Sequence, residues 1–284
     1  MADAPFFPGF EAMDVAVDDV TIHAVRGGKG PPLLLLHGAP QSHVMWRHVA
    51  PGLAERFTVV AADLRGYGRS SKPEAGDYSK RRMAGDQVGL MRALGHERFR
   101  LAGHDRGARV ARRLAKDHPQ AVEKLAIIDI VPTAHIYSNT DRRVATNLWH
   151  WFFFIQPAPI PEMLMGPQAA AMAMGRAVGE DGAAAGRAYA ETNGNAEAFH
   201  AMCEDYRAGA GIDIAHDEAD AGTLIACPTL VIWGAQSGTT GQLFDVPSLW
   251  RKEAADVRFE SIECGHFVPE EKPRETLDAL LAFM

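Results

Sequence analysis

The stretch Phe99-Arg100-Leu101-Ala102-Gly103-His104-Asp105-Arg106-Gly107 decides how this chain folds. Its first four residues predict a short strand, and residues 108–117 have the composition of a helix that ends before Pro119. The two glycines permit a tight turn that presents the side chain of Asp105 above a sheet. The stretch therefore predicts a strand, a sharp turn and a helix, with a carboxylate at the apex. An aspartate that merely caps the helix is the alternative.

Short apolar runs on both sides of this stretch alternate with helical patterns. This alternation is typical of a mostly parallel sheet with helices on both faces. The runs expected to be strands are Pro32–Leu36, Phe57–Ala62, Phe99–Ala102, Lys124–Ile128, Thr229–Trp233 and Val257–Ile262. A leading antiparallel strand is expected at Asp18–Ala24. The predicted fold class is thus α/β.

The stretch from about Pro132 to Gly222 breaks the alternation. It is rich in alanine, methionine and aromatic residues, and it contains helical fragments and turns but no strand pattern. We therefore expect a helical cap at residues 132–222, inserted between two parts of one core domain, residues 1–131 and 223–284.

Length and charge limit the classes of function. A chain of 284 residues suits one large domain, and its formal net charge of −7 argues against nucleic acid or an anionic membrane as partner. No signal peptide is recognisable, and the longest apolar run is too short to span a bilayer. The three cysteines, Cys203, Cys227 and Cys264, show no CxxC pairing and are expected to be free thiols in a reducing cytoplasm.

An aspartate at the apex of the turn changes the chemistry, because the common elbow, G-x-S-x-G, carries a serine there. A carboxylate is a poor acylating nucleophile, but it displaces a good leaving group from saturated carbon and becomes an alkyl ester. Water must then attack this ester, which requires a general base and an oxyanion site. Asp105 is therefore the predicted nucleophile. Dehalogenases and epoxide hydrolases use such chemistry.

The general base is predicted to be His266, which follows a late glycine after the last expected strand. The order nucleophile, acid, histidine of the α/β-hydrolase fold places the base there. The acid that orients it is preferentially Asp129, at the end of the strand that follows the elbow helix. The loop after Thr229–Trp233, the usual place, has no carboxylate before Asp245, which stays the alternative. Asp129 could instead be a simple turn residue.

Two backbone N–H groups are expected to form the oxyanion site. One belongs to Arg106, directly after the nucleophile, and the other to Ala39 in the turn His37-Gly38-Ala39-Pro40. A plain strand-ending turn is the alternative for residues 37–40.

Arg106 and Arg109 lie in the first turn of the expected helix, where a positive charge opposes the helix dipole by about 0.3–1 kcal/mol. A helix N-terminus with two guanidinium groups can bind an anion, and arginine pairs with a carboxylate in bidentate fashion. This favours a substrate with a carboxylate beside its electrophilic carbon, such as a 2-haloacid. The alternative is that both arginines are solvated or pair with Asp129 or Asp63.

A halide that leaves saturated carbon needs hydrogen-bond donors aimed at it. The expected cap offers His150, Trp151 and Tyr206, each of which can donate to a halide. Aromatic-rich helices more often serve packing, so these three residues carry little weight alone.

The chain resembles the fluoroacetate (haloacetate) dehalogenases over essentially its whole length. The shared segments are residues 103–109, 127–129, 147–153, 156–159, 204–209 and 265–267. The resemblance implies that Asp105 is the nucleophile, His266 the base and Asp129 the acid. It also implies that Arg106 and Arg109 hold the substrate carboxylate, and that the departing halide is bound by His150, Trp151 and Tyr206. It further implies a cytoplasmic homodimer without metal or cofactor.

One position departs from the family. Ala39 stands where relatives usually carry an aromatic residue, which removes a wall of the pocket and leaves the preferred substrate size open.

The expected reaction is hydrolytic dehalogenation of a short 2-haloacid to the 2-hydroxyacid, with fluoroacetate to glycolate as the leading case. An epoxide hydrolase is the first rival, since Tyr137, Tyr189 and Tyr206 could supply its two cap tyrosines. Paired arginines do not help a neutral epoxide, which favours the dehalogenase. The second rival, a non-catalytic receptor for a small acid, is disfavoured by the presence of nucleophile, base and acid together.

Overall fold

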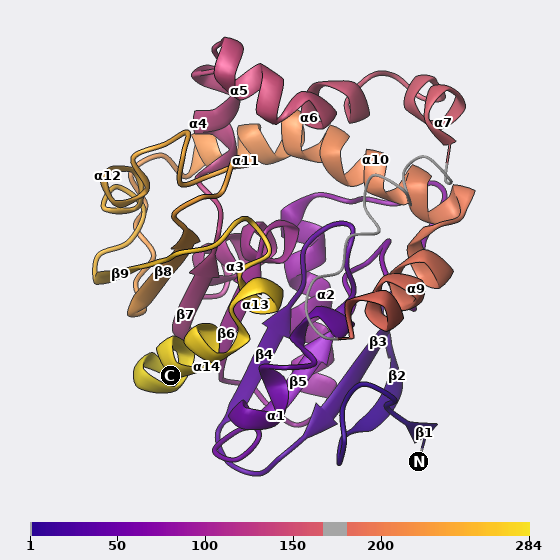
Figure 1. Ribbon diagram of the computed structural model, residues 1–284, viewed down its shortest axis with the longest axis vertical. Helices are drawn as coiled ribbons and strands as arrows, with labels where there is room; N and C mark the ends of the chain where they lie inside the picture. The colour runs from indigo at the N-terminus through magenta and orange to yellow at the C-terminus, as the bar shows by residue number, and fades with distance from the viewer. Residues whose placement is uncertain (1, 167–180) are drawn as a thin grey trace.

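The computed structural model describes residues 2–166 and 181–284, and nine strands within them form one sheet (Figure 1). The strand order is β1-β2-β3-β5-β4-β6-β7-β8-β9. The strands are β1 (Ala2–Asp3), β2 (Glu11–Val17), β3 (Val20–Gly27), β4 (Pro32–Leu36), β5 (Thr58–Ala62), β6 (Phe99–His104), β7 (Val122–Ile128), β8 (Thr229–Gly234) and β9 (Val257–Ile262). In this order, the strands β5, β4, β6, β7, β8 and β9 are parallel to their neighbours. The strands β1, β2 and β3 pair antiparallel with one another, and β3 also pairs antiparallel with β5. The predicted mostly parallel α/β fold is confirmed.

Helices cover both faces of this sheet, and the strands are apolar on both faces for that reason. In β4, for example, Leu33 and Leu35 belong to one apolar core and Leu34 and Leu36 to the other. The helices outside the segment between β7 and β8 are η1 (His43–Trp46, a 3₁₀ turn), α1 (Ala50–Leu53), α2 (Lys80–Ala93), α3 (Arg106–Asp117), α12 (Val246–Trp250), α13 (Val268–Glu271) and α14 (Pro273–Phe283).

The described elements between β7 and β8 are all helices. They are α4 (Thr133–Ser138), α5 (Arg142–Asn147), α6 (Trp149–Phe154), α7 (Ile160–Leu164), α9 (Gly182–Asn193), α10 (Ala196–Ala210) and α11 (Ile212–Ala219). In Figure 1 the group from α4 to α7, with α10 and α11, lies across one end of the sheet. Part of the expected cap, residues 167–180, lies outside the described residues, and the cap boundaries 132 and 222 stay a prediction.

The leading strand predicted at Asp18–Ala24 needs a correction. Asp18 and Asp19 form the turn of a hairpin between β2 and β3, and Asp18 adopts a left-handed φ of 49°. Aspartate tolerates this conformation better than most residues, and two-residue hairpin turns require it. The strand therefore begins at Val20, after the turn.

Parallel strands bring their carboxyl ends to one edge of the sheet. The loops after β4, β6, β7 and β9 carry Ala39, Asp105, Asp129 and His266, four residues that are separated by up to 227 positions in the chain (266 − 39). This edge is where the cap helices lie. No helix in the described ranges has the length and apolar composition required to cross a membrane.

Candidate active site

The elbow places Asp105 in a strained conformation between β6 and α3. Its φ is 45° and its ψ −116°, a combination that side chains rarely adopt. A Cβ at Gly103 would lie 2.5 Å from the carbonyl oxygen of Gly107, and one at Gly107 would lie 2.4 Å from that of His37. Only glycine fits at these two positions, so the turn is as tight as the sequence predicted.

The carboxylate of Asp105 does not cap α3, which rules out the helix-cap alternative. Its Oδ2 instead accepts a hydrogen bond of 3.0 Å from the backbone N–H of Ala39. A Cβ at Gly38 would lie 2.6 Å from the Cβ of Asp105, so glycine is also required for the close approach of this loop. The loop after β4 thus presents a backbone donor beside the carboxylate of Asp105, and the N–H of Arg106 stands at the start of α3.

His266 and Asp129 meet at the same edge. The Nδ1 of His266 lies 2.6 Å from Oδ2 of Asp129, whose φ is 55° and whose side chain is fully buried. The backbone N–H of Gly234 and the hydroxyl of Ser237 donate to the two oxygens of Asp129 at 2.9 and 2.7 Å. Asp245, the alternative acid, instead caps α12 through the N–H of Ser248 at 3.1 Å.

Burial and the neighbouring negative charges shift the pKa of His266 in opposite directions. Burial lowers its pKa, but the hydrogen bond and the negative charge of Asp129, together with the charge of Asp105, outweigh burial and leave the pKa above 6.5. For Asp105, burial raises the pKa, but the positive charges of His266, Arg106 and Arg109 outweigh burial and leave the pKa below its ordinary value. Asp105 is therefore ionised at neutral pH.

His104 is a neighbour that the sequence did not single out. Its Nε2–H donates to the backbone oxygen of His266 at 2.8 Å, and the two rings lie 4.8 Å apart between centroids. Burial lowers the pKa of His104 to about 4, so it is neutral at physiological pH. A neutral, buried donor fixes the loop that carries His266 without adding a second positive charge there.

Of the two predicted carboxylate-binding arginines, Arg109 lines the cavity and Arg106 does not. Arg109 lines the cavity beside Asp105, and its Nη1 donates to Val131 O at 3.0 Å and to Thr133 Oγ1 at 2.7 Å. Burial, and then the nearby charge of Arg106, lower the pKa of Arg109 to about 10, which leaves it cationic at neutral pH. Its buried Nε has no hydrogen-bond partner among the described residues.

The Arg106 guanidinium is held from the opposite side by Asp205 of α10. Its Nε and Nη2 donate to the two carboxylate oxygens at 2.7 and 2.9 Å. Tyr67 donates to the same carboxylate at 2.7 Å, and Lys80 forms an ion pair with it. The sequence alternatives for Arg106, Asp129 or Asp63, were therefore wrong. Asp205 was missed although it precedes Tyr206, because its partner lies 99 residues away.

The three candidate halide donors meet in the cavity. His150 and Trp151 of α6 and Tyr206 of α10 all line it with Asp105 and His266. The ring centroids of His150 and Tyr206 lie 6.1 Å apart, and those of Trp151 and Tyr206 5.8 Å. Burial lowers the pKa of His150 to about 4 and raises that of Tyr206. Both are therefore neutral at physiological pH.

The cavity has a volume of about 290 Å³ and is mostly apolar. Residues that the sequence did not single out complete its wall, namely Pro40, Ile136, Leu148, Trp149, Phe154, Met165, Met202, Thr239, Thr240 and Phe267. Ala39 also lines it, at the position where an aromatic was expected in relatives. The volume leaves room beyond a two-carbon acid.

Similarity to known proteins agrees with this geometry. Residues 31–273 match the family model of the alpha/beta hydrolase fold. The chain is 46% identical to a fluoroacetate dehalogenase of a Burkholderia species, covering 98% of this chain and 95% of that protein. It is 33% identical to a soluble epoxide hydrolase of a Corynebacterium species, covering 94% of each. A crystal structure from Nostoc sp PCC 7120, whose α/β hydrolase assignment is itself provisional, superposes with a TM-score of 0.91 at 47% identity, covering 96% of this chain and 97% of that one.

Proposed function

This chain belongs to the α/β hydrolase fold family, and from that premise we propose that it hydrolyses the carbon–halogen bond of a short 2-haloacid. The leading case is fluoroacetate to glycolate and fluoride. One observation carries the proposal: an ionised elbow aspartate, backed by His266 and Asp129, shares a cavity with Arg109 and with neutral donors from the cap. The 46% identity to a fluoroacetate dehalogenase over nearly the whole chain supports the same reaction.

The first step forms an ester. A carboxylate oxygen of Asp105 attacks the α-carbon of the haloacid in line with the carbon–halogen bond, and the halide leaves with the bonding electrons. His150, Trp151 and Tyr206 donate hydrogen bonds to the departing halide, which is stabilised in a site that excludes bulk water. The negative charge of Asp105 passes to the halide, so the net charge of the site is unchanged.

The second step restores the enzyme. His266 removes a proton from water, Asp129 stabilises the imidazolium that forms, and the resulting hydroxide attacks the carbonyl carbon of the Asp105 ester. The backbone N–H of Ala39, 3.0 Å from the carboxylate in the free enzyme, is placed to hold the oxyanion, with that of Arg106. Collapse of the intermediate breaks the ester bond, and the departing alkoxide takes the proton from His266 to give the 2-hydroxyacid. The hydroxyl oxygen of this product comes from Asp105, which retains one oxygen atom from water.

The experiment that tests the covalent scheme is a single turnover in heavy-oxygen water. The label should enter Asp105 first and appear in glycolate only in later turnovers. Label in glycolate from the first turnover would contradict an aspartyl ester. Fluoride and chloride release, measured side by side on fluoroacetate and chloroacetate, establishes which halide the site expels.

An epoxide hydrolase is the second candidate, supported by the Corynebacterium relative. Tyr206 lines the cavity and could protonate an epoxide oxygen, whereas Tyr137 does not line it and packs behind the lining residue Trp151, with 5.7 Å between ring centroids. Tyr189 donates to Glu270 at 3.0 Å and does not line the cavity. Diol from styrene oxide, without halide from chloroacetate, would favour this candidate.

Substitutions of Arg109 and Arg106 are expected to affect substrate binding and the stability of the fold differently. Arg109→Gln removes a charge-assisted contact worth about 1.5–3 kcal/mol and should lower kcat/KM for haloacetate about 10- to 100-fold, with some loss of Tm from the hydrogen bonds to Val131 and Thr133. Arg106→Gln should also lower the Tm, because it leaves the buried carboxylate of Asp205 with fewer partners. Neutral haloacetamide is the control substrate. An equal loss with haloacetamide would show that Arg109 does not bind the substrate carboxylate.

The cavity wall is expected to set substrate size. Ala39→Phe restores an aromatic wall but keeps the backbone N–H that faces Asp105. Haloacetate turnover should change less than about threefold, whereas a 2-halobutyrate should lose more than about tenfold in kcat/KM, since each excluded methylene forfeits about 0.8 kcal/mol. Ala39→Gly is the matched control and should spare both substrates. If Ala39→Phe lost activity equally on haloacetate and on the 2-halobutyrate, residue 39 would not set the size of substrate that the cavity accepts.

Turnover is expected to fall at acidic pH. His266 must be neutral to accept a proton, and its raised pKa means that it stays protonated up to a pH above 6.5. Below this pKa the rate of ester hydrolysis should drop tenfold per pH unit. The ester also removes the charge of Asp105, so the midpoint for kcat should lie below the pKa of His266 in the free enzyme. A pH profile of kcat beside an NMR titration of His266 measures both; a flat profile would exclude His266 as the base.

The protein is further proposed to act as a cytoplasmic homodimer. The cysteines Cys203, Cys227 and Cys264 are unpaired, which suits a reducing compartment. Trp149, Met163 and Leu164 expose large apolar side chains on α6 and α7, a surface that a second copy could cover. Light scattering of the purified chain measures the oligomeric state.

A further inference from the structure

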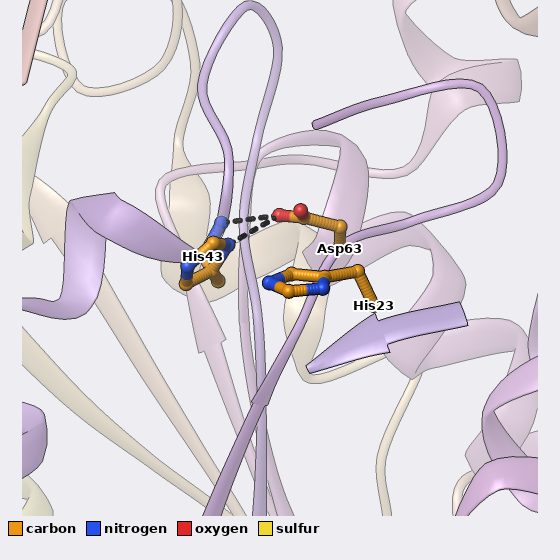
Figure 2. A group of neighbouring side chains, drawn as sticks. All are labelled: His23, His43 and Asp63. Carbon is orange, nitrogen blue, oxygen red and sulfur yellow. Dashed lines mark hydrogen bonds and ion pairs between the residues drawn. The ribbon is translucent and has the colours of Figure 1, made fainter. Parts of the chain in front are cut away.

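A second group of titratable side chains lies outside the cavity. His23 comes from β3, His43 from η1 and Asp63 from the residue after β5 (Figure 2). One donor atom from each of the three lies within 4.8 Å of the other two, and all three residues are buried. Figure 2 shows the outer ring nitrogen of His23 facing the His43–Asp63 pair.

Carboxylates orient both imidazoles. The Nδ1 of His43 lies 2.9 Å from Oδ1 of Asp63, and the Nδ1 of His23 lies 2.7 Å from Oδ1 of Asp14. A carboxylate accepts, so each Nδ1 donates, and in the neutral rings each Nε2 presents a lone pair. No hydrogen bond among the described residues ends on either Nε2. Asp14 thus holds His23 as an outer carboxylate holds most histidine ligands of metals, whereas His43 faces Asp63 with its Nδ1, the atom that would bind an ion shared with that carboxylate.

We propose that His23, His43 and Asp63 form a binding site for one divalent transition-metal ion, with Zn²⁺ as the best match. The ligands are Nε2 of His23, Nδ1 of His43 and Oδ1 of Asp63. The ion takes the place of the proton between His43 and Asp63, and that proton is released to solvent. Ligand atoms of a tetrahedral Zn²⁺ lie roughly 3.3 Å apart. The distance of 2.9 Å between Nδ1 of His43 and Oδ1 of Asp63 must therefore lengthen slightly, and the widest distance within the group, up to 4.8 Å, must shorten by about 1.5 Å.

The surroundings favour a cation with nitrogen and oxygen ligands. A small cavity of about 50 Å³ adjoins the three residues, and Glu191 of α9 and Arg69 also line it. Asp14, Asp63 and Glu191 supply three negative charges, and the positive charges nearby are those of Arg69, which lines the cavity, and Lys72, which interacts with Asp63. Glu191 or water can complete the coordination. Imidazole nitrogen suits Zn²⁺, Co²⁺ or Ni²⁺, whereas Mg²⁺ and Ca²⁺ prefer oxygen ligands.

The bound ion would stabilise the fold near the active site. It would join β3, η1 and the end of β5, and η1 begins four residues after Ala39, whose N–H faces Asp105. An ion that binds the folded chain alone stabilises it by mass action. At a hundredfold excess over Kd the Tm should rise by roughly 5 °C.

Calorimetric titration of the EDTA-treated, dialysed full chain with Zn²⁺ tests the site. We expect one ion per chain and the rise in Tm. His23→Gln should weaken binding at least about 30-fold and abolish the rise in Tm while halide release is retained. Asp14→Asn, which alters only an exposed side chain that orients His23, should weaken binding about tenfold.

His96→Gln is the matched control, since this half-buried histidine lines a different cavity; the variant should bind Zn²⁺ like the unmodified chain. The absence of stoichiometric binding, or a Kd that His23→Gln and Asp14→Asn leave unchanged, would overturn the proposal. Because halide release is measured on the same samples, failure of the metal site and failure of the dehalogenase reaction are distinguished.

Discussion

Replacing Asp105 by asparagine is expected to reduce halide release by at least about 10⁴-fold, the loss typical of a missing nucleophile. The amide has nearly the same shape and still accepts the hydrogen bond from the N–H of Ala39, 3.0 Å away in the native chain. It lacks the negative charge that the site stabilises through His266 and Arg106. Fluoride and chloride release under substrate saturation measures the loss, and the Tm should change little.

Asp245→Asn is the matched control. It makes the same chemical change in a carboxylate that caps α12, and its turnover should stay within about twofold of the unmodified enzyme. Mass spectrometry must confirm that the asparagine at position 105 has not been hydrolysed back to aspartate. If the intact Asp105→Asn protein then retains more than a tenth of the activity, another group is the nucleophile.

Replacing His266 by glutamine is expected to stop the reaction after its first half. Asp105 should still expel one halide per active site, because alkylation needs no base. Hydrolysis of the ester then lacks its proton acceptor, and steady turnover should fall about 10²- to 10⁴-fold. A rapid burst of one halide per site, followed by a slow phase, would show this division.

The trapped intermediate gives the second readout for this variant. The peptide that contains Asp105 should carry one added carboxymethyl group after incubation with haloacetate, and the unmodified enzyme should not accumulate it. His96→Gln serves as control and should turn over normally without a burst. A His266→Gln protein with neither burst nor modified peptide would mean that His266 acts before the ester forms.

The conformation of the elbow could be predicted from a short stretch of sequence. Gly103 and Gly107 meet backbone atoms at distances that exclude any Cβ, and Asp105 takes a positive φ. These constraints arise among residues a few positions apart, and they leave the sequence few alternatives. The strands beside the elbow were also recognisable, because burial on both faces requires nearly continuous apolar runs.

Long-range pairings were harder to predict. From the residues, the preference for Asp129 over Asp245 rested on the position of Asp129 at the end of a neighbouring strand. The 2.6 Å contact with His266 joins residues that are 137 positions apart. The turn at Asp18 and Asp19 was missed although these two residues interrupt the apolar alternation between Val17 and Val20, because a hairpin turn depends on a left-handed backbone that aspartate merely tolerates.

The sequence by itself determined the fold class, the elbow and the aspartate at its apex, because these depend on local backbone constraints and on strand-scale burial. Only the tertiary structure decided what the charged side chains do. Arg106 and Arg109 are three positions apart, yet one is held by Asp205 of the cap and the other faces the cavity. The energy of a buried charge depends on partners and solvent exclusion supplied by distant segments, and neither can be read from spacing along the chain.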